Sequence, residues 1–136
     1  MALDLVGRFC NSGIDIEGTG KSMLELSQRV LKIRGQEMFE LSIPSTPPFP
    51  YDGYLRFLRF DIGEGLVHIR REGDCMLVRG SVEKIEMFAS NIASLALQET
   101  DSISLHAHIE YYSGHFFLLE GSEPIILTRK DAIKLR

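Results

Sequence analysis

Apolar residues recur with two different periods along the chain, and together these periods predict a fold built from both helices and strands. From Met23 to Ile33 and from Ile85 to Ala96, apolar residues return every three or four positions, which is typical of helices packed through one face. Shorter apolar or alternating segments predict strands at 14–17, 54–62, 66–71, 75–79, 103–112, 115–119 and 125–127. We therefore expect an α+β fold in which two amphipathic helices pack on a mostly antiparallel sheet.

A unit of strand, glycine, hydroxyl side chain and helix occurs twice. Gly18-Thr19 and Gly80-Ser81 each follow a predicted strand and precede a predicted helix. In each unit the hydroxyl oxygen is expected to cap the helix that begins there. Aligning the two units places the apolar positions of one helix on those of the other. The chain is expected to be one domain (residues 1–136). Either this domain consists of two related halves, 10–62 and 66–128, or common turn chemistry occurs here twice independently.

Glycine and proline positions predict where the elements end. Arg34-Gly35 predicts the end of the first helix, through a cation in the last turn and a glycine after it. Segment 43–53 holds four of the five prolines, so it is predicted to be an extended connector between the halves. Further turn signals predict a meander over 54–79 and a hairpin around Ser113-Gly114. The charged tail, 129–136, is expected to fray.

Length and charge narrow the class of protein. The 136 residues suffice for one core, and the hydrophobic fraction of 44% with 25% charged residues is typical of an ordered globular domain. Fifteen basic and nineteen acidic side chains give a net charge of −4, which argues against binding to nucleic acid or to a membrane surface. The first residues do not resemble a secretory leader, and no apolar stretch reaches membrane-spanning length. We expect a soluble cytoplasmic protein.

Three familiar kinds of chemical site are not supported by the sequence. Gly18 to Ser22 resembles the end of a phosphate-binding loop, but Asp15 stands where that motif needs its first glycine, so no nucleotide cofactor is predicted. Cys10 and Cys75 form neither a disulfide framework nor a zinc clamp, and we expect both to be reduced and structural. No serine elbow or carboxylate pair at a catalytic spacing occurs. The sequence therefore predicts no enzyme.

The one constellation with chemical potential is His106-Ala-His108-Ile-Glu110. On a strand, alternate residues share a face, so His106, His108 and Glu110 are expected to point outward together. Two imidazoles and a carboxylate can ligate a metal ion, and His115 is expected just across the hairpin turn. A polar outer face of an antiparallel sheet needs no more than polar side chains, so the same pattern is explained without any metal.

The segment from His106 to His115, with Tyr111-Tyr112 inside it, and Ser122 to Leu127 resemble the C-terminal signature of immunity protein 32, a family of polymorphic-toxin systems. The resemblance extends over residues 76–128, and Ser113 stands where the family pattern tends to have a proline. It implies a non-enzymatic protein that binds and neutralises a cognate toxin. The residues expected at the contact surface are His106, His108, Glu110, Tyr111, Tyr112 and His115.

Three hypotheses of function therefore follow. The first is a protein-binding module of the immunity type, whose partner is a cognate toxin protein. The second is a metal-binding protein, or a small metal-dependent enzyme, that uses His106, His108 and Glu110. The third is a structural domain that associates into a homodimer through the edges of its sheet.

Overall fold

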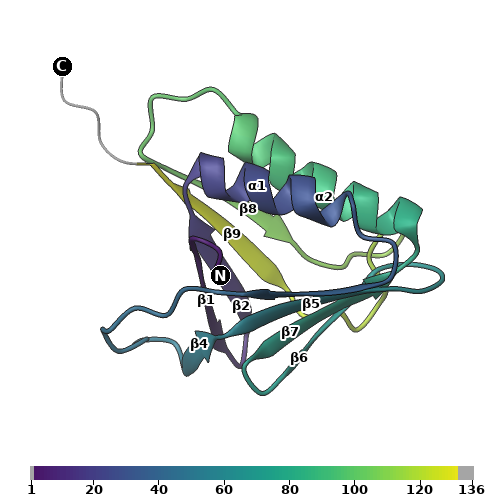
Figure 1. Ribbon diagram of the computed structural model, residues 1–136, viewed down its shortest axis with the longest axis horizontal. Helices are drawn as coiled ribbons and strands as arrows, with labels where there is room; N and C mark the ends of the chain where they lie inside the picture. Colours follow the sequence, from purple (N-terminus) through teal and green to yellow (C-terminus); the bar gives the residue numbers. More distant parts are fainter. Residues whose placement is uncertain (1, 132–136) are drawn as a thin grey trace.

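The structure is a computed structural model that describes residues 2–131. In this range two helices and nine strands confirm the predicted α+β class (Figure 1). In chain order the elements are β1 (Leu5–Cys10), β2 (Gly13–Gly18), α1 (Gly20–Val30), β3 (Gln36–Glu40), β4 (Gly53–Leu55), β5 (Phe57–Ile62), β6 (His68–Glu72), β7 (Cys75–Gly80), α2 (Val82–Leu97), β8 (Ser104–Ile109) and β9 (Ile125–Lys130).

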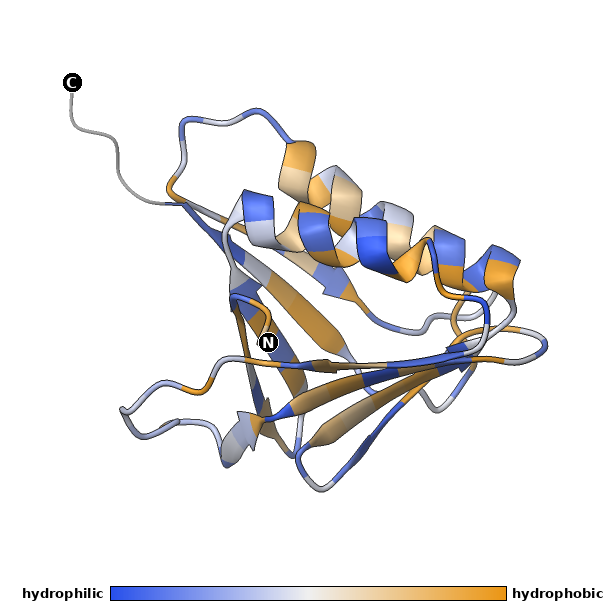
Figure 2. Cartoon of the chain, in the orientation of Figure 1, coloured by the Kyte–Doolittle hydropathy of each residue, from blue (hydrophilic) through white to orange (hydrophobic). Residues whose placement is uncertain are grey.

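The strands form two sheets, which enclose the core together with the helix pair. The five-stranded sheet has the order β4-β1-β2-β9-β8 and the four-stranded sheet the order β3-β5-β7-β6. Figure 1 shows the sheets inclined to each other, with α1 and α2 side by side across the wide end of the wedge. The buried residues of the strands and helices are almost all apolar, and Figure 2 shows apolar and polar residues interspersed along these elements. Neither helix in residues 2–131 is long and apolar enough to cross a membrane.

Each sheet combines strands from both halves of the chain. In the first half, hairpin β1–β2 leads into α1 and then β3 and β5; in the second, hairpin β6–β7 leads into α2 and then β8 and β9. Strand β2 of the first hairpin pairs with β9, which in turn pairs with β8. Strand β7 of the second hairpin pairs with β5, which in turn pairs with β3. The parallel pairs β2·β9 and β5·β7 are the places where the halves join. Apart from β4, which has no counterpart strand in the second half, the halves therefore share one topology and exchange strands, while their origin by duplication stays a prediction.

Both helices begin as predicted, but the first ends early. Thr19 and Ser81 are the N-caps, and their hydroxyl oxygens accept hydrogen bonds from backbone N–H groups three residues later, at 3.1 and 3.2 Å. The prediction that α1 ends at Arg34-Gly35 is wrong, because the helix ends at Val30 and Gly35 does not adopt positive φ. The Arg34 guanidinium instead binds the carbonyls of the turn that follows the helix.

Two predictions about strand pairing are wrong. The predicted strand 54–62 is interrupted at Arg56, where the chain passes from the five-stranded sheet (β4) to the four-stranded sheet (β5). The predicted meander over 54–79 fails because β5 lies beside β7 in parallel, while β6 takes the edge. In this arrangement β7, which carries buried Met76 and Val78, becomes an interior strand of its sheet. The connector 43–53 contains no helix, and β4 begins at its last residue, Gly53. It lies between β3 and β4, which both belong to the first half.

The predicted hairpin around Ser113-Gly114 is also wrong. Strand β8 ends at Ile109 and pairs with β9, and residues 110–119 form no strand of their own. This segment, which we call the 110–119 loop, crosses to the four-stranded sheet, where Leu118 bridges to Val67. Phe117 and Leu118 are buried, so the apolar residues that suggested a strand anchor the loop in the core instead.

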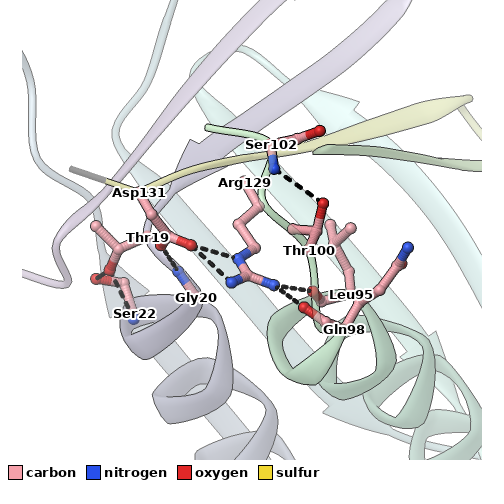
Figure 3. A network of polar contacts seen from close by, with 9 residues as sticks. All are labelled: Thr19, Gly20, Ser22, Leu95, Gln98, Thr100, Ser102, Arg129 and Asp131. Carbon is pink, nitrogen blue, oxygen red and sulfur yellow. Dashed lines mark hydrogen bonds and ion pairs between the residues drawn. The ribbon is translucent and has the colours of Figure 1, made fainter. Parts of the chain in front are cut away.

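Arg129 and Asp131 fasten the end of β9 to both helices (Figure 3). The Arg129 guanidinium donates to the carbonyls of Leu95 and Gln98 at the C-terminus of α2, at 3.0 and 2.8 Å. It also pairs with Asp131, whose carboxylate accepts the backbone N–H of Gly20 at 2.9 Å. The positive N-terminus of α1 thus receives a carboxylate of the chain itself. The expected fraying is wrong for residues 129 and 130, which belong to β9; residues 132–136 lie outside the described range.

Candidate functional site

The outer face of the five-stranded sheet is the candidate site. Side chains alternate along each strand, so this face receives the polar residues of β1, β2, β9 and β8, while their apolar neighbours enter the core. We call this surface the polar face. Its members are Arg8, Asp15, Glu17, His106, His108, Thr128 and Lys130. The outward orientation predicted for His106 and His108 is correct, since both are exposed while Ile109 is buried.

Asp15 is the most enclosed charged residue of the polar face, with a relative exposure of 6%. Its Oδ1 accepts a hydrogen bond from Thr128 Oγ1 at 2.8 Å. Because that bond uses the single hydroxyl hydrogen of Thr128, His106 Nδ1, 3.3 Å from the same Oγ1, must be the donor in that contact. Burial raises the pKa of Asp15, and this effect exceeds the opposing effect of the Thr128 hydrogen bond.

Arg8 gives Asp15 only weak compensation. Its Nη1 lies 3.9 Å from Asp15 Oδ2, beyond hydrogen-bond distance, but 3.2 Å from Glu17 Oε1. Lys130 also turns to Glu17, with Nζ 3.4 Å from the same oxygen. Both cations of the polar face are therefore directed at Glu17, and Asp15 Oδ2 has no hydrogen-bond donor among residues 2–131.

A pocket of about 290 Å³ opens beside Asp15. Its lining comes from the β1–β2 hairpin, the end of β8, the start of β9 and the proline-rich connector: Cys10, Ser12, Gly13, Ile14, Asp15, Tyr51, His108, Glu110, Pro124, Ile125 and Ile126. No lysine or arginine of the described chain lines it. Tyr51 and Asp15 both line this pocket. Burial, and secondarily the negative charge of Asp15, raise the pKa of the Tyr51 phenol.

The proline-rich connector supplies one wall of the polar face. Phe49, Pro50 and Tyr51 line a shallower groove together with His106 and His108. The Phe49 side chain is 87% exposed, the most exposed large apolar residue in the described chain. The connector is therefore more than a spacer, because it places aromatic rings next to the polar face.

The six residues predicted from the sequence divide between two places. His106, His108 and Glu110 lie on the polar face or at the rim of its pocket. Tyr111, Tyr112 and His115 belong to the 110–119 loop, which leaves that sheet. Tyr111 packs partly against the core, whereas Tyr112 is exposed and its ring centroid lies 4.6 Å from that of His115.

His115 has a structural role in the loop. Its Nδ1 accepts hydrogen bonds from the backbone N–H groups of Phe117 and Leu118, at 3.2 and 3.0 Å. Burial lowers the pKa of His115, in keeping with a neutral ring that must accept at Nδ1. His115 is consequently not across a hairpin from His106, as the sequence suggested. Within residues 2–131 no group of three histidine, cysteine or acidic side chains is placed to hold a metal ion.

The cysteines lie apart and both are free. Cys10 Sγ is 3.0 Å from Ser12 Oγ, and hydrogen bonding from Ser12 lowers the pKa of its thiol. Burial raises the pKa of the Cys75 thiol. Cys10 is therefore the more readily ionised of the two, and it lines the pocket beside Asp15.

Sequence reasoning missed the position of Asp15, Phe49 and Tyr51 at the candidate site. The alternation of Ile14-Asp15-Ile16-Glu17 was a usable signal, because it already places both acids on one side of a strand. What it does not reveal is that β2 pairs with β9, which brings Thr128 and β8 alongside.

Comparisons of the chain with protein families, curated proteins and solved structures found no match. What the polar face binds is therefore inferred from its own chemistry.

Proposed function

We propose that this protein is a cytoplasmic, non-enzymatic binding module that holds a partner protein against its polar face, in the manner of an immunity protein with its cognate toxin. The observation that carries the proposal is the position of Phe49, whose aromatic side chain is exposed to solvent beside the polar face. Aromatic anchors surrounded by polar groups are typical of the centres of protein–protein interfaces.

The composition of the polar face supports a protein partner. Histidines, a tyrosine and charged side chains from four strands and the connector lie on one surface that is larger than the pocket alone. Protein interfaces combine such aromatic and polar residues with modest hydrophobicity overall. The likeness of residues 76–128 to immunity protein 32 points in the same direction, since proteins of that family are regarded as partners of toxins.

The charge of the surface favours a basic partner. Asp15, Glu17 and Glu110 are opposed by Arg8 and Lys130, so the acidic groups are in excess, and the whole chain carries a net charge of −4. Complementary potentials mainly accelerate association and select between partners. A basic toxin is therefore a better fit than an acidic one.

The test uses the product of the reading frame next to this gene as the candidate partner. Co-expression is expected to relieve the toxicity of that product, and the purified pair should form a complex measurable by calorimetry. Phe49→Ala and His108→Ala are each expected to weaken the complex at least about tenfold, as truncation of an interface anchor does. A third variant, Tyr112→Ala, shows whether the contact surface extends onto the 110–119 loop.

The second sheet offers a matched control. Met38 lies on the outer face of β3, where it is half exposed and precedes the buried Phe39, as His108 precedes the buried Ile109 on β8. Met38→Ala should leave the affinity unchanged. A partner whose affinity falls with Met38→Ala but not with Phe49→Ala or His108→Ala binds elsewhere, and toxicity that persists despite co-expression would contradict the immunity role.

A further inference from the structure

The pocket beside Asp15 has a charge that its own residues leave unbalanced. Asp15 and Glu110 contribute two carboxylates, and no cationic side chain of the described residues lines the space. The side chain of Asp15 is 9% exposed and its Oδ2 lacks a donor, because Arg8 is directed at Glu17. Removing a carboxylate from water without a full set of partners is costly, so a largely buried carboxylate that lines a pocket marks a candidate site for a cationic ligand.

The fold itself does not require a carboxylate at this position. Asp15 lies three residues before Gly18 and Leu77 lies three residues before Gly80, so the two hold equivalent places in the halves. Both lie opposite an arginine of the neighbouring hairpin strand, Arg8 and Arg70. In the second half this place is filled by an apolar side chain, and the strand forms equally well. A strand at this place therefore does not need a carboxylate in order to form, although the Asp15 carboxylate also accepts the Thr128 hydrogen bond across β2·β9.

The shape of the pocket selects the kind of cation. At about 290 Å³ it lies just below the range for small-molecule sites, roughly 300–1,000 Å³, so it suits one extended side chain. Pro124, Ile126 and the ring of Tyr51 supply apolar wall for a methylene stem. A planar guanidinium can stack on an aromatic ring and bind carboxylates through several donors, whereas an ammonium is a compact, strongly hydrated charge. A metal ion would need a third ligand that the described residues do not place there.

We propose that this pocket receives an arginine side chain of the partner protein, with its guanidinium held by the carboxylates of Asp15 and Glu110 beside the ring of Tyr51. The inference rests on the proposed function for the source of the arginine. Glu110 was expected at a contact surface from the sequence, and here it acquires a specific task as the second carboxylate of a guanidinium site.

The test is a titration followed by ¹H–¹⁵N NMR spectra of the full chain. The probe is N-acetyl-L-arginine methylamide, and the matched control compound is the citrulline analogue, which has the same shape without the charge. Shifts are expected at Cys10, Gly13, Tyr51 and Glu110 with the arginine compound, and at least about tenfold weaker binding with the citrulline compound. Asp15→Asn should weaken binding of the arginine compound about tenfold, while its own spectrum shows that it is folded.

The control variant is Asp61→Asn, which removes a carboxylate from the four-stranded sheet, where Asp61 pairs with Arg59. It should bind the arginine compound like the parent protein. Equal binding of the two compounds, or unchanged binding by Asp15→Asn, would overturn the inference even if the partner protein binds the polar face. Arginine-specific binding at the pocket, with no partner protein bound by that face, would overturn the proposed function and leave the guanidinium specificity in place.

Discussion

Thr128 donates a hydrogen bond from its hydroxyl to the Asp15 carboxylate over 2.8 Å, and the two residues are 113 positions apart in the chain. The bond crosses the parallel pair β2·β9, where the two halves of the protein meet. The candidate site is therefore built on the seam between the halves, and neither half contains it alone. Folding of the whole chain is a condition for the site to exist.

The first prediction concerns Asp15 and pH. Burial raises the pKa of this carboxyl group, while the Thr128 hydrogen bond, Arg8 and His106 oppose the rise and Glu17 adds to it. The folded state therefore binds the proton more tightly than the unfolded chain does. This contribution to stability is fully present below the ordinary pKa of about 3.9 and is lost as the pH rises through the pKa of the folded state.

Asp15→Asn, which keeps an oxygen to accept from Thr128, is accordingly expected to gain stability relative to the parent as the pH rises from 3 to 7. Urea unfolding at a series of pH values measures the difference. Asp61→Asn is the matched variant on the other sheet. A difference between parent and Asp15→Asn that does not change with pH would contradict the assignment of Asp15 as a desolvated carboxyl group.

The second prediction concerns His115, whose Nδ1 is the acceptor for two backbone N–H groups of buried residues. His115→Ala leaves these donors without an acceptor and should reduce the free energy of unfolding by about 2–3 kcal/mol. His115→Asn should recover part of the loss, because an asparagine side chain can accept from the backbone N–H two residues on. Denaturant unfolding of the parent, His115→Asn and His115→Ala measures their free energies of unfolding, which are expected to decrease in that order.

The same residue has a pH signature of opposite sign to that of Asp15. Burial lowers the pKa of His115, so the folded state favours the neutral ring and its contribution is present above the ordinary pKa of 6.5. Between pH 7.5 and 5.5 the parent should therefore lose stability relative to His115→Asn. If His115→Ala instead leaves the free energy of unfolding unchanged and lowers the affinity for the partner protein, His115 contacts the partner and does not stabilise the 110–119 loop.

The third prediction concerns Arg129, which joins the C-terminus of α2 to Asp131. Its side chain is only 15% exposed, and it donates charge-assisted hydrogen bonds to two carbonyls at the negative end of the helix. Arg129→Ala should therefore lower the free energy of unfolding by about 2–3 kcal/mol. Arg70→Ala is the control, because Arg70 forms an exposed pair with Glu72, and such pairs contribute about 0–1 kcal/mol. Equal losses in the two variants would contradict the structural role of Arg129.

Local chemistry predicted the parts of the fold that depend on neighbouring residues. The caps Thr19 and Ser81 and the apolar faces of both helices follow from short-range rules, and the structure has them where the sequence places them. The end of α1 was misplaced because Gly35 satisfies the local rule for a helix stop, although the helix has already ended five residues earlier, at Val30. Competing local signals of this kind are decided by packing.

Pairing between distant strands was beyond such rules. The apolar residues of 115–119 suit a strand, but burial of Phe117 and Leu118 under the other sheet satisfies them equally well. The outward row of His106 and His108 follows from alternation alone and was predicted correctly. Its neighbours Asp15 and Phe49 were not, because a sequence period says which face a residue takes and not which strand lies next to it.

The fourth prediction follows from the exchange of strands. A cut in the turn between Gly63 and Gly65 leaves β1 to β5 with α1 in one fragment and β6 to β9 with α2 in the other. Each fragment lacks one strand of each parallel pair, β2·β9 and β5·β7, and lacks the helix against which its own helix packs. The buried hydrogen bond from Ser27 on α1 to Ala89 on α2 is lost as well. Neither fragment should therefore fold alone.

Mixed in equal amounts, fragments 1–64 and 65–136 are expected to regain the circular dichroism spectrum of the intact chain and a single cooperative thermal transition. The reason is that association buries the apolar core that the two fragments share. Asp15→Asn in the first fragment should leave this reassembly intact, since Leu77 occupies the equivalent place in the other half. Ser27→Ala should weaken it by about 1 kcal/mol, the net contribution of one buried hydrogen bond. A cooperative thermal transition in either fragment by itself would show that one half folds independently and that the sheets do not need strands from both.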